Sequence, residues 1–496
     1  MTVLLREKRA PEPTVFELSS PGRGKWRLPE PDVEPIDPAE AFGEENLRGA
    51  PPALPELTEP EVARHFMRLA EMNHHIEKAI YPLGSCTMKY NPKINEEVAG
   101  LRGFTRLHPE TEPSECQGAI ALMYDLSRHL CEISGMDAVS LQPPAGASGE
   151  LAGMLIFRAV MRDRGERRTK VIVPDSAHGT NPASLALSGF SPVELASGPD
   201  GRVDIERLRE LMDEDTAGVM ITNPNTLGVF ERRVDELTGI VHDAGGLAYL
   251  DGANLNASLG VVRPGDLGFD VMHFNLHKTF SAPHGGGGPG SGPIGVKSPL
   301  AGYLPGPLPA RDERRTGGVE YYMDYDRPRS IGKVHSWYGN FLVMVKAYAY
   351  ILSLGPSGLR RVAENAVLNA NYLQESLRDV YELPYGGRCQ HEFVLSVSRQ
   401  KEEGVRALDV AKRLLDMGLH APTIYFPLIV KEALMIEPTE TESRRSLDGF
   451  IAAMRRIADE VREDPEAVTG APVETPVGRL DEARAARELD VVWEDE

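Results

Sequence analysis

The sequence contains few cysteines, and they are far apart. Cys86, Cys116, Cys131 and Cys389 are the only four among 496 residues, and no two of them form a CxxC pair. This scarcity argues against a zinc site built from cysteines, and it suits a protein of the reducing cytoplasm. We therefore expect a cytoplasmic protein.

Basic residues and long apolar runs are also scarce. There are 54 lysines and arginines against 74 acidic residues, which gives a formal net charge of −20. A polyanion would be repelled by this charge, so nucleic-acid binding is not expected. No apolar run reaches the roughly eighteen residues of a membrane span, and the apolar stretch near the amino end is too short for a secretory signal.

What the sequence does contain is typical of a globular protein with more than one domain. Its apolar fraction is 41% and its charged fraction 26%, over a length that permits two or three domains. Residues 1–60 are rich in proline and acid and predict an extended arm. We expect a large cofactor-binding α/β domain with an N-terminal helical segment over 61–335, a smaller α+β domain over 336–465, and a tail over 466–496.

The large domain shows strands alternating with helices. Predicted strands cover 138–141, 170–174, 217–222, 247–251 and 270–276; predicted helices cover 60–77, 91–98, 116–133, 149–162, 204–213 and 234–244. Further helices are predicted over 334–354, 360–379, 441–461 and 484–496, and the segments 393–397, 405–417 and 433–436 are expected to mix strand and helix. This alternation predicts a mostly parallel sheet covered on both faces, and ligands in such sheets lie beyond the carboxyl ends of the strands.

An acid and a lysine follow two of these strands. Asp251 ends the strand 247–251, and Lys278 follows the run 270–276. Pyridoxal phosphate needs an amine to hold its aldehyde as a Schiff base and a carboxylate to keep its ring nitrogen protonated. Lys278 and Asp251 are the candidates for these roles, although most lysines and aspartates are ordinary surface or turn residues.

Two other strand ends offer groups that suit the same cofactor. The segment PPAGASGE (143–150) follows one strand and opens a helix, so its first N–H groups and Ser148 form a candidate phosphate site. His178 follows the strand 170–174 and could stack on a flat ring, although a lone histidine is more often structural. After the strand 217–222, Asn225 and Thr226 could meet a cofactor hydroxyl, but we favour a simple Asn-Pro turn there.

Metal binding is a weaker interpretation. His273, His277 and His284 are close in sequence, but no HExxH motif or acidic ligand set accompanies them. The pair His74-His75 lies on a predicted helix and is expected to be solvated. We therefore expect no metal site.

Several segments resemble one known family. YPLGSCTMKYNP (81–92), QPPAGASGE (142–150), SAHGTNPAS (176–184), LDGAN (250–254) and DVMHFNLHKTFSAPHGGGGPGSGP (270–293) closely resemble glycine decarboxylase, the pyridoxal-phosphate P-protein of the glycine cleavage system. The resemblance covers most of residues 60–450. The length of the chain is similar to that of the bacterial subunit 2, which is the half that contains the cofactor lysine.

The resemblance implies a fold, an activity and partners. The fold would be that of the aspartate aminotransferase-like (fold type I) enzymes. The activity would be that of glycine dehydrogenase (aminomethyl-transferring): decarboxylation of glycine, release of CO2 and transfer of the aminomethyl group to the lipoyl arm of H-protein. A subunit 1 partner would complete an α2β2 heterotetramer. Apart from the resemblance, we expect the arm or the tail to help hold this assembly.

The resemblance also implies roles for individual residues. The catalytic residues would be Lys278, holding the cofactor as a covalent Schiff base, Asp251 at the ring nitrogen, and His178 stacked on the ring. Ala147 and Ser148 would bind the phosphate. Further cofactor contacts are implied for three residues of the same motifs, namely Ala253, Asn275 and His277. Lys89 and His284 are candidates for binding the glycine carboxylate.

Two alternatives remain open at this point. Another fold type I enzyme, such as an aminotransferase or a cysteine desulfurase, would use the same lysine and aspartate. A desulfurase also needs a reactive loop cysteine, and Cys389 is the only cysteine in the predicted small domain. A non-enzymatic scaffold that keeps the fold is disfavoured, because both Lys278 and Asp251 are present.

Overall fold

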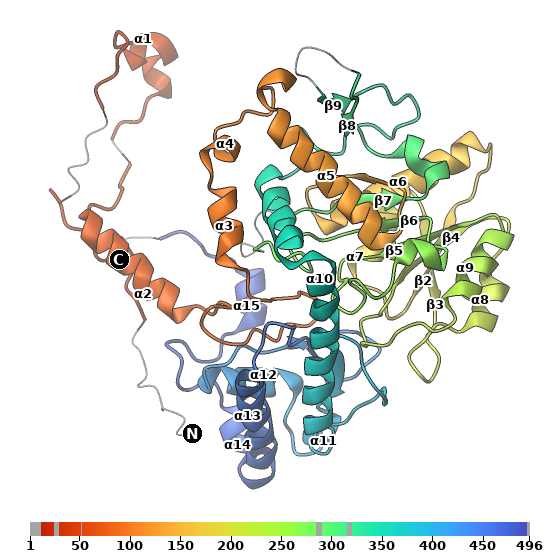
Figure 1. Ribbon diagram of the computed structural model, residues 1–496. Coiled ribbons are helices and arrows are strands. Elements are labelled where there is room, and N and C mark those ends of the chain that lie inside the picture. Colours follow the sequence, from red (N-terminus) through yellow and green to blue (C-terminus); the bar gives the residue numbers. More distant parts are fainter. Residues whose placement is uncertain (1–10, 24–28, 51, 284–289, 315–319, 494–496) are drawn as a thin grey trace. The chain divides into compact units, whose positions relative to one another are not determined.

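The computed structural model describes residues 11–23, 29–50, 52–283, 290–314 and 320–493. His284 and most of the predicted polyglycine turn lie outside these residues. The chain divides into two compact units (Figure 1): one joins the N-terminal segment up to Lys78 with the segment from Ala471 onwards, and the other extends from Ala79 to Gly470.

The terminal unit contains little regular structure, as its proline content predicts. Its elements are α1 (Pro38–Phe42), η1 (Glu44–Asn46), α2 (Glu59–Met72) and α15 (Glu482–Arg487). The predicted start of α2 is confirmed, since the backbone N–H and the hydroxyl of Thr58 both donate to the carboxylate of Glu61, at 2.9 and 2.8 Å. The helix ends sooner than predicted because Asn73 has an extended backbone. The same unit therefore contains the arm and residues 61–78, which the sequence assigned to the large domain.

A seven-stranded sheet forms the centre of the Ala79–Gly470 unit, in the order β1-β7-β6-β5-β4-β2-β3. Its strands are β1 (Ala138–Ser140), β2 (Lys170–Pro174), β3 (Ser191–Leu195), β4 (Thr216–Thr222), β5 (Leu247–Asp251), β6 (Val271–His273) and β7 (Ile294–Val296). Only β7 runs antiparallel to its neighbours, β1 and β6. The predicted mostly parallel sheet is confirmed.

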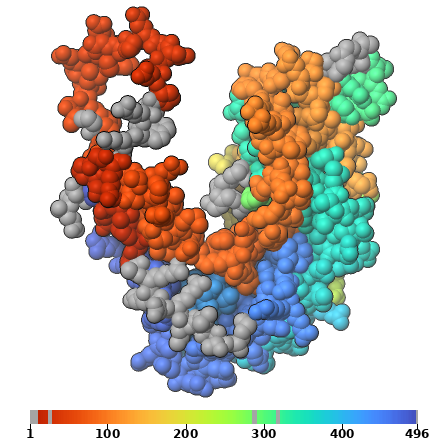
Figure 2. All heavy atoms as spheres, turned by 60° about the vertical axis from the view of Figure 1, so that its left-hand side comes forward, coloured from red at the N-terminus to blue at the C-terminus, as the bar shows by residue number. Residues whose placement is uncertain are grey.

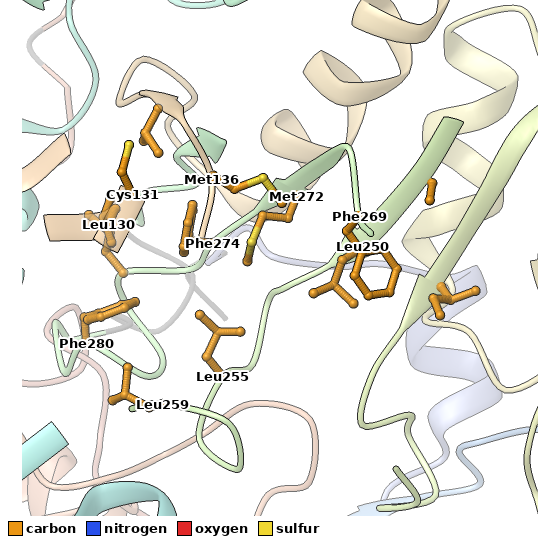
Figure 3. Packing of buried hydrophobic residues seen from close by; sticks show 14 of the residues in the cluster. Leu130, Cys131, Met136, Leu250, Leu255, Leu259, Phe269, Met272, Phe274 and Phe280 are labelled. Carbon is orange, nitrogen blue, oxygen red and sulfur yellow. The ribbon is translucent and has the colours of Figure 1, made fainter. Parts of the chain in front are cut away.

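Both faces of the sheet are covered, because alternate residues of each strand point to opposite sides. On β5, Ala248 and Leu250 belong to one apolar core, whereas Leu247 and Tyr249 belong to another. Figure 3 shows part of the first core, where Leu250 and Met272 lie near Phe269 and Phe274. The helices that cover the sheet include α5 (Gln117–Ser134), α6 (Gly146–Asp163), α7 (Thr180–Leu187), α8 (Ile205–Leu211) and α9 (Val234–Asp243).

The span labelled α10 (Phe341–Leu377) consists of two helical stretches that meet at a kink, where Gly355 is non-helical and Pro356 follows. The prediction of two separate helices, 334–354 and 360–379, agrees with this break. Gly355 has φ 61°, which a residue with a side chain rarely adopts. In Figure 2 the orange helices α3 (Lys93–Ala99), α4 (Arg102–Thr105) and α5 form an outer layer next to the cyan residues of α10. Among the described residues, α10 alone has the length and apolar composition of a membrane span. Buried core helices share these properties, and 44% of its most apolar window is buried.

A second apolar centre lies in the C-terminal part of the same unit. There a three-stranded antiparallel sheet contains β10 (Phe393–Ser396), β12 (Ala433–Ile436) and β11 (Thr423–Ile424). It packs with α12 (Ala407–Asp416) and α13 (Arg444–Glu463) around a core separate from those of the large sheet. This is the mixed α+β composition predicted for 336–465; the exact boundary at 335/336 stays a prediction.

The remaining elements are short. They are η2 (Pro113–Glu115), η3 (Pro264–Leu267), η4 (Ser298–Tyr303), β8 (Leu308–Arg311), β9 (Tyr321–Asp324), α11 (Ser398–Lys401) and α14 (Pro465–Thr469). Strands β8 and β9 pair as an isolated hairpin.

Candidate functional site

A pocket of about 240 Å³ lies at the carboxyl edge of the large sheet. It is bounded by segments that follow β1, β2, β4, β5 and β6, and by residues that precede β10. Its lining consists of Ser85, Gly146, Ala147, Glu150, His178, Thr180, Thr222, Pro224, Thr226, Asp251, Ala253, Asn254, Asn275, His277, Lys278, His391 and Glu392. The structure thus brings together seven of the eight predicted cofactor residues; Ser148 lies on the adjoining first turn of α6.

Lys278 reaches the pocket from a turn and not from a strand. Strand β6 ends at His273, three residues before the predicted end, because the chain turns and the N–H of Lys278 donates to the carbonyl of Asn275 at 3.0 Å. The ε-amine of Lys278 donates to the carbonyl of Ser85 at 2.8 Å. Ser85 and Thr87 both have positive φ, at 66° and 53°, so the loop that meets the lysine has a strained backbone.

Asp251 is buried at the end of β5, and its carboxylate is held by several donors. The side chain of Asn181 and the backbone N–H of Ala253 each donate to it at 3.0 Å. Burial by itself raises the pKa of Asp251, but His273, these hydrogen bonds and His178 together leave it below its usual value. Asp251 therefore stays ionised although it is buried.

His273 supports Asp251 from behind, a role that the sequence did not predict. Its Nε2 atom lies 3.5 Å from Oδ1 of Asp251, and its Nδ1 atom lies 2.7 Å from the hydroxyl of Tyr249. Burial lowers the pKa of His273 to about 4, so the ring is neutral. A neutral ring that accepts from Tyr249 has its only N–H on Nε2, facing the aspartate.

The amino end of α6 lies at the edge of the pocket, where the sequence predicts an anion site. Helix α6 begins at Gly146, directly after the PPA turn, and its first N–H groups have no partner within the helix. A Cβ on Gly146 would lie only 2.5 Å from Oδ1 of Asn275, so the two segments approach too closely for a larger residue. Asn275 Oδ1 and the hydroxyl of Thr222, both on pocket-lining residues, are buried without a hydrogen-bond partner in the described structure.

His178 belongs to a hydrogen-bonded group that includes an unexpected glutamate. Its Nδ1 atom lies 2.9 Å from the hydroxyl of Thr180, which donates to Glu150 at 2.7 Å. Burial, and then the charge of Asp251, raises the pKa of Glu150 to about 7. Burial lowers the pKa of His178, so its ring faces the pocket uncharged near neutral pH.

Two weaker predictions from the sequence have different outcomes. After β4, Asn225 serves a turn, since its side chain accepts from the N–H groups of Leu227 and Val229, but Thr226 lines the pocket. The prediction that Lys89 binds the substrate carboxylate is wrong. Its ammonium is buried and donates to Glu440 at 2.7 Å, to the carbonyl of Thr279 and to the hydroxyl of Tyr350. These three hydrogen bonds use all three of its protons. His284 lies outside the described residues.

The small sheet contributes pocket residues that were not predicted from the sequence. His391 and Glu392 line the pocket, and Glu437 lies beside them; their ligating atoms all lie within 4.8 Å of one another. These residues could not be predicted from the sequence, because they are far from Lys278 in the chain and belong to no recognisable motif. The pairing of β10 with β12 is what brings them together.

The cysteines are free thiols, and Cys389 does not suit a nucleophile. Only 4% of its surface is exposed, and burial raises its pKa to about 12. A protonated, buried thiol is unreactive. The desulfurase alternative is therefore disfavoured.

These groups fit pyridoxal phosphate. The pocket has an amine, a buried ionised carboxylate on the far side, an uncharged flat ring and a helix amino end for an anion. The unpartnered oxygens of Thr222 and Asn275 indicate that the pocket awaits a polar ligand.

Comparisons with known proteins agree with this chemistry. Residues 147–287 match the family model described as aminotransferase class-V, and residues 362–473 match that of the glycine dehydrogenase C-terminal domain. Proteins named probable glycine dehydrogenase (decarboxylating) subunit 2 are similar over almost the whole length. That of Chlorobium phaeobacteroides is 56% identical over 97% of this chain and 99% of its own, and that of Oceanobacillus iheyensis is 56% identical over 96% and 97%.

Solved structures show the same fold at lower identity. A crystal structure titled glycine decarboxylase (P-protein) of the glycine cleavage system, in inhibitor-bound form, superposes with a TM-score of 0.71 at 24% identity, covering 84% of this chain and 94% of that one. The cysteine desulfurase of Thermococcus onnurineus superposes with a TM-score of 0.57 at 17% identity, covering 77% and 97%. The expected fold type I architecture is confirmed.

Proposed function

The chain belongs to the glycine dehydrogenase (decarboxylating) subunit 2 family, and from this premise we propose how its residues decarboxylate glycine. Its activity is that of the glycine cleavage system, in a pyridoxal-phosphate-dependent fold. The observation that supports the assignment of roles is the meeting of Lys278, Asp251, His178 and the amino end of α6 in one pocket.

Pyridoxal phosphate would be held at four points. Lys278 would bind its aldehyde as a Schiff base, and Asp251 would pair with its ring nitrogen. His178 would stack on the ring. The phosphate would take the free N–H groups of α6 around Ala147 and Ser148, and further contacts would come from Ala253, Asn275 and His277.

The cofactor supplies an electron sink for the bond electrons that CO2 leaves behind. The chain's own residues make that sink effective. Asp251 keeps a full negative charge at the buried end of the pocket, because Asn181 and Ala253 donate to it and His273 faces it. Once glycine is bound, the ε-amine of Lys278 would be free to accept or return a proton at the substrate.

The aminomethyl group of glycine would pass to the oxidised lipoyl arm of H-protein. The family is named for a subunit 2, which implies a subunit 1; we propose an α2β2 heterotetramer that works in the cytoplasm. The free state of all four cysteines agrees with that compartment. Nucleic acid and membrane are not expected as partners.

The test is exchange of labelled bicarbonate into glycine. The chain is purified with its subunit 1, and exchange is measured with lipoylated H-protein present and absent. We expect exchange that depends on H-protein and on pyridoxal phosphate and is lost in Lys278→Ala. Exchange that persists in Lys278→Ala would contradict the role of this lysine, and no exchange in the wild-type complex would contradict the function.

A further inference from the structure

Two buried glutamates face each other across the small sheet beside Lys278. Strands β10 and β12 pair antiparallel with Phe393 opposite Ile436, so the next pair outward is Glu392 opposite Glu437. Only 3% and 0% of these residues are exposed. Like charges directly opposite in a sheet repel, and burial increases the repulsion. Two ionised carboxylates at this place would be costly.

Each glutamate is fixed by the strained loop that also meets Lys278. Glu392 accepts from the N–H of Ser85 at 2.8 Å. Glu437 accepts from the N–H and the hydroxyl of Thr87 at 3.0 and 2.9 Å, and from the side chain of Asn254 at 2.9 Å. Glu392 lines the pocket, whereas Glu437 lies behind it.

His391 shows that this wall awaits a ligand. It is 1% exposed and lines the pocket, yet neither ring nitrogen has a hydrogen-bond partner in the described structure. Its Nε2 atom lies 3.6 Å from Oε1 of Glu392. A buried imidazole without partners costs free energy unless a ligand satisfies it. Burial, with a contribution from Lys278, lowers its pKa to about 3, so the ring is a neutral donor.

We propose that His391 and Glu392 receive the carboxylate of glycine, and that Glu437 shares one proton with Glu392 so that this wall donates hydrogen bonds without a fixed positive charge. The inference rests on the proposed function. With one shared proton the pair has a charge of −1, which the ammonium of a displaced Lys278 balances. His391 and Glu392 touch the substrate; Glu437 is a positioning residue.

Other charged groups around the pair agree with this assignment. Burial raises the pKa of both carboxyl groups. The pKa of Glu392 lies well above its usual value, because the charge of Glu437 adds to the effect of burial. Lys278 opposes the rise in both. The thiol of Cys86, which also faces the pair, is kept protonated because burial raises its pKa. Glu440, near Glu437 in sequence, is paired with Lys89.

A wall of this kind suits a reaction that discharges a carboxylate. The bond between Cα and the carboxylate carbon breaks, its electron pair stays on the Cα side, and CO2 leaves uncharged; no proton moves in this step. A fixed cation would hold the charged ground state more strongly than the departing CO2, which would oppose the reaction. Neutral donors fix the direction of the carboxylate at a smaller cost.

The two glutamates give opposite predictions when each is replaced by glutamine. In Glu437→Gln the repulsion is gone, although burial, the larger cause, still raises the pKa of Glu392. Glu392 therefore loses its proton at a lower pH than in the wild type and then presents an acceptor to the substrate carboxylate. We expect the fall in glycine affinity, roughly tenfold or more as for loss of a hydrogen bond to a charged group, to begin at a lower pH than in the wild type. In the wild type the affinity should fall at alkaline pH, where the pair gives up its shared proton. In Glu392→Gln a permanent amide donor replaces that proton, so we expect the affinity to be retained and this fall to disappear.

The experiment uses the complex with subunit 1, loaded with pyridoxal phosphate. At each of several pH values between 6 and 9, glycine binding is titrated by following the change in cofactor absorbance. Bicarbonate exchange is measured in parallel. His391→Phe should weaken glycine binding at every pH, whereas His391→Gln should rescue part of it. The spectrum without glycine should be the same in all variants.

Three results would overturn the inference. Equal loss of affinity in Glu392→Gln and Glu437→Gln with an unchanged pH profile would indicate a merely structural pair. Unchanged glycine affinity in His391→Phe would place the carboxylate elsewhere. Stoichiometric zinc or manganese in the purified complex, with glycine binding lost on chelation, would make these residues metal ligands. The wild-type complex serves as the control. If it exchanges bicarbonate, the proposed function holds, and any of these three results concerns the further inference alone.

Discussion

The Nε2 atom of His273 lies 3.5 Å from Oδ1 of Asp251, and neither side chain reaches solvent. The hydroxyl of Tyr249 lies 2.7 Å from Nδ1, the other ring nitrogen of His273. Tyr249 fixes one nitrogen of the ring, so the other, which has no hydrogen-bond partner among the described residues, stays directed at the aspartate. The arrangement fixes a negative charge at the position where a pyridine nitrogen must remain protonated.

Replacing Asp251 with asparagine removes this charge with almost no change in shape. We expect the exchange rate of Asp251→Asn to fall by about 100-fold or more, the scale observed when one preorganised electrostatic group is lost. Asp175→Asn is the matched control, because Asp175 follows β2, accepts from Ser197 and does not line the pocket. A rate for Asp251→Asn within about threefold of the control would contradict the role of Asp251.

The close approach at Gly146 gives a prediction about cofactor affinity. In Gly146→Ala the added Cβ would lie 2.5 Å from Asn275 Oδ1, so either the helix start or Asn275 must move. Overpacking of about 1–3 kcal/mol at this contact should weaken pyridoxal phosphate roughly tenfold or more. Gly239→Ala in α9 meets no atom within 4 Å and serves as the control. Fluorescence titration of both variants with pyridoxal phosphate measures the two affinities. Equal affinities would argue against a phosphate site at the start of α6.

Glu150 should make the cofactor-free chain less stable as pH rises. Its folded pKa is raised from 4.5 to about 7, so the native state binds more protons than the unfolded state between these values. The contribution is therefore fully present below pH 4.5 and is lost as pH rises through 7, by on the order of 3 kcal/mol. Urea unfolding at pH 5 and pH 8 should show a smaller pH effect in Glu150→Gln. The exposed Glu97→Gln should keep the wild-type difference, and an unchanged difference in Glu150→Gln would refute the assignment.

Lys89 should matter for stability and not for the cofactor. Lys89→Met leaves the carboxylate of Glu440 buried without its cation, which should cost about 3–5 kcal/mol of unfolding free energy. The double variant Lys89→Met/Glu440→Gln should recover much of this loss, because no unpaired charge remains. Both should bind pyridoxal phosphate with the wild-type spectrum when folded. A stable Lys89→Met chain that fails to bind glycine would restore Lys89 as a substrate residue.

Local patterns in the sequence were sufficient for the large sheet and for the residues at its edge. Apolar runs such as 170–174 and 247–251 match β2 and β5, because a buried parallel strand needs apolar residues on both faces. Parallel strands end at one edge, so Asp251, His178 and the turn before α6 had to be neighbours. The strand before Lys278 was predicted too long, since the apolar residues Phe274 and Leu276 are buried in a turn and not in a strand.

The residues that no pattern predicted come from contacts between distant parts of the chain. Glu392 and Glu437 meet because two short strands pair, and each is an ordinary glutamate when considered alone. His273 reads as a strand residue, and only the position of Tyr249 shows that it supports Asp251. Lys89 was misassigned because Glu440, which neutralises it, is far away in sequence.

The most direct test is to find which lysine binds the cofactor. The complex with subunit 1 is loaded with pyridoxal phosphate, reduced with borohydride to fix the Schiff base, digested and mapped by mass spectrometry. Within this chain, we expect the pyridoxyl group on Lys278 and none in Lys278→Ala. A label on another lysine of this chain, or a wild-type chain that remains unlabelled, would contradict this expectation.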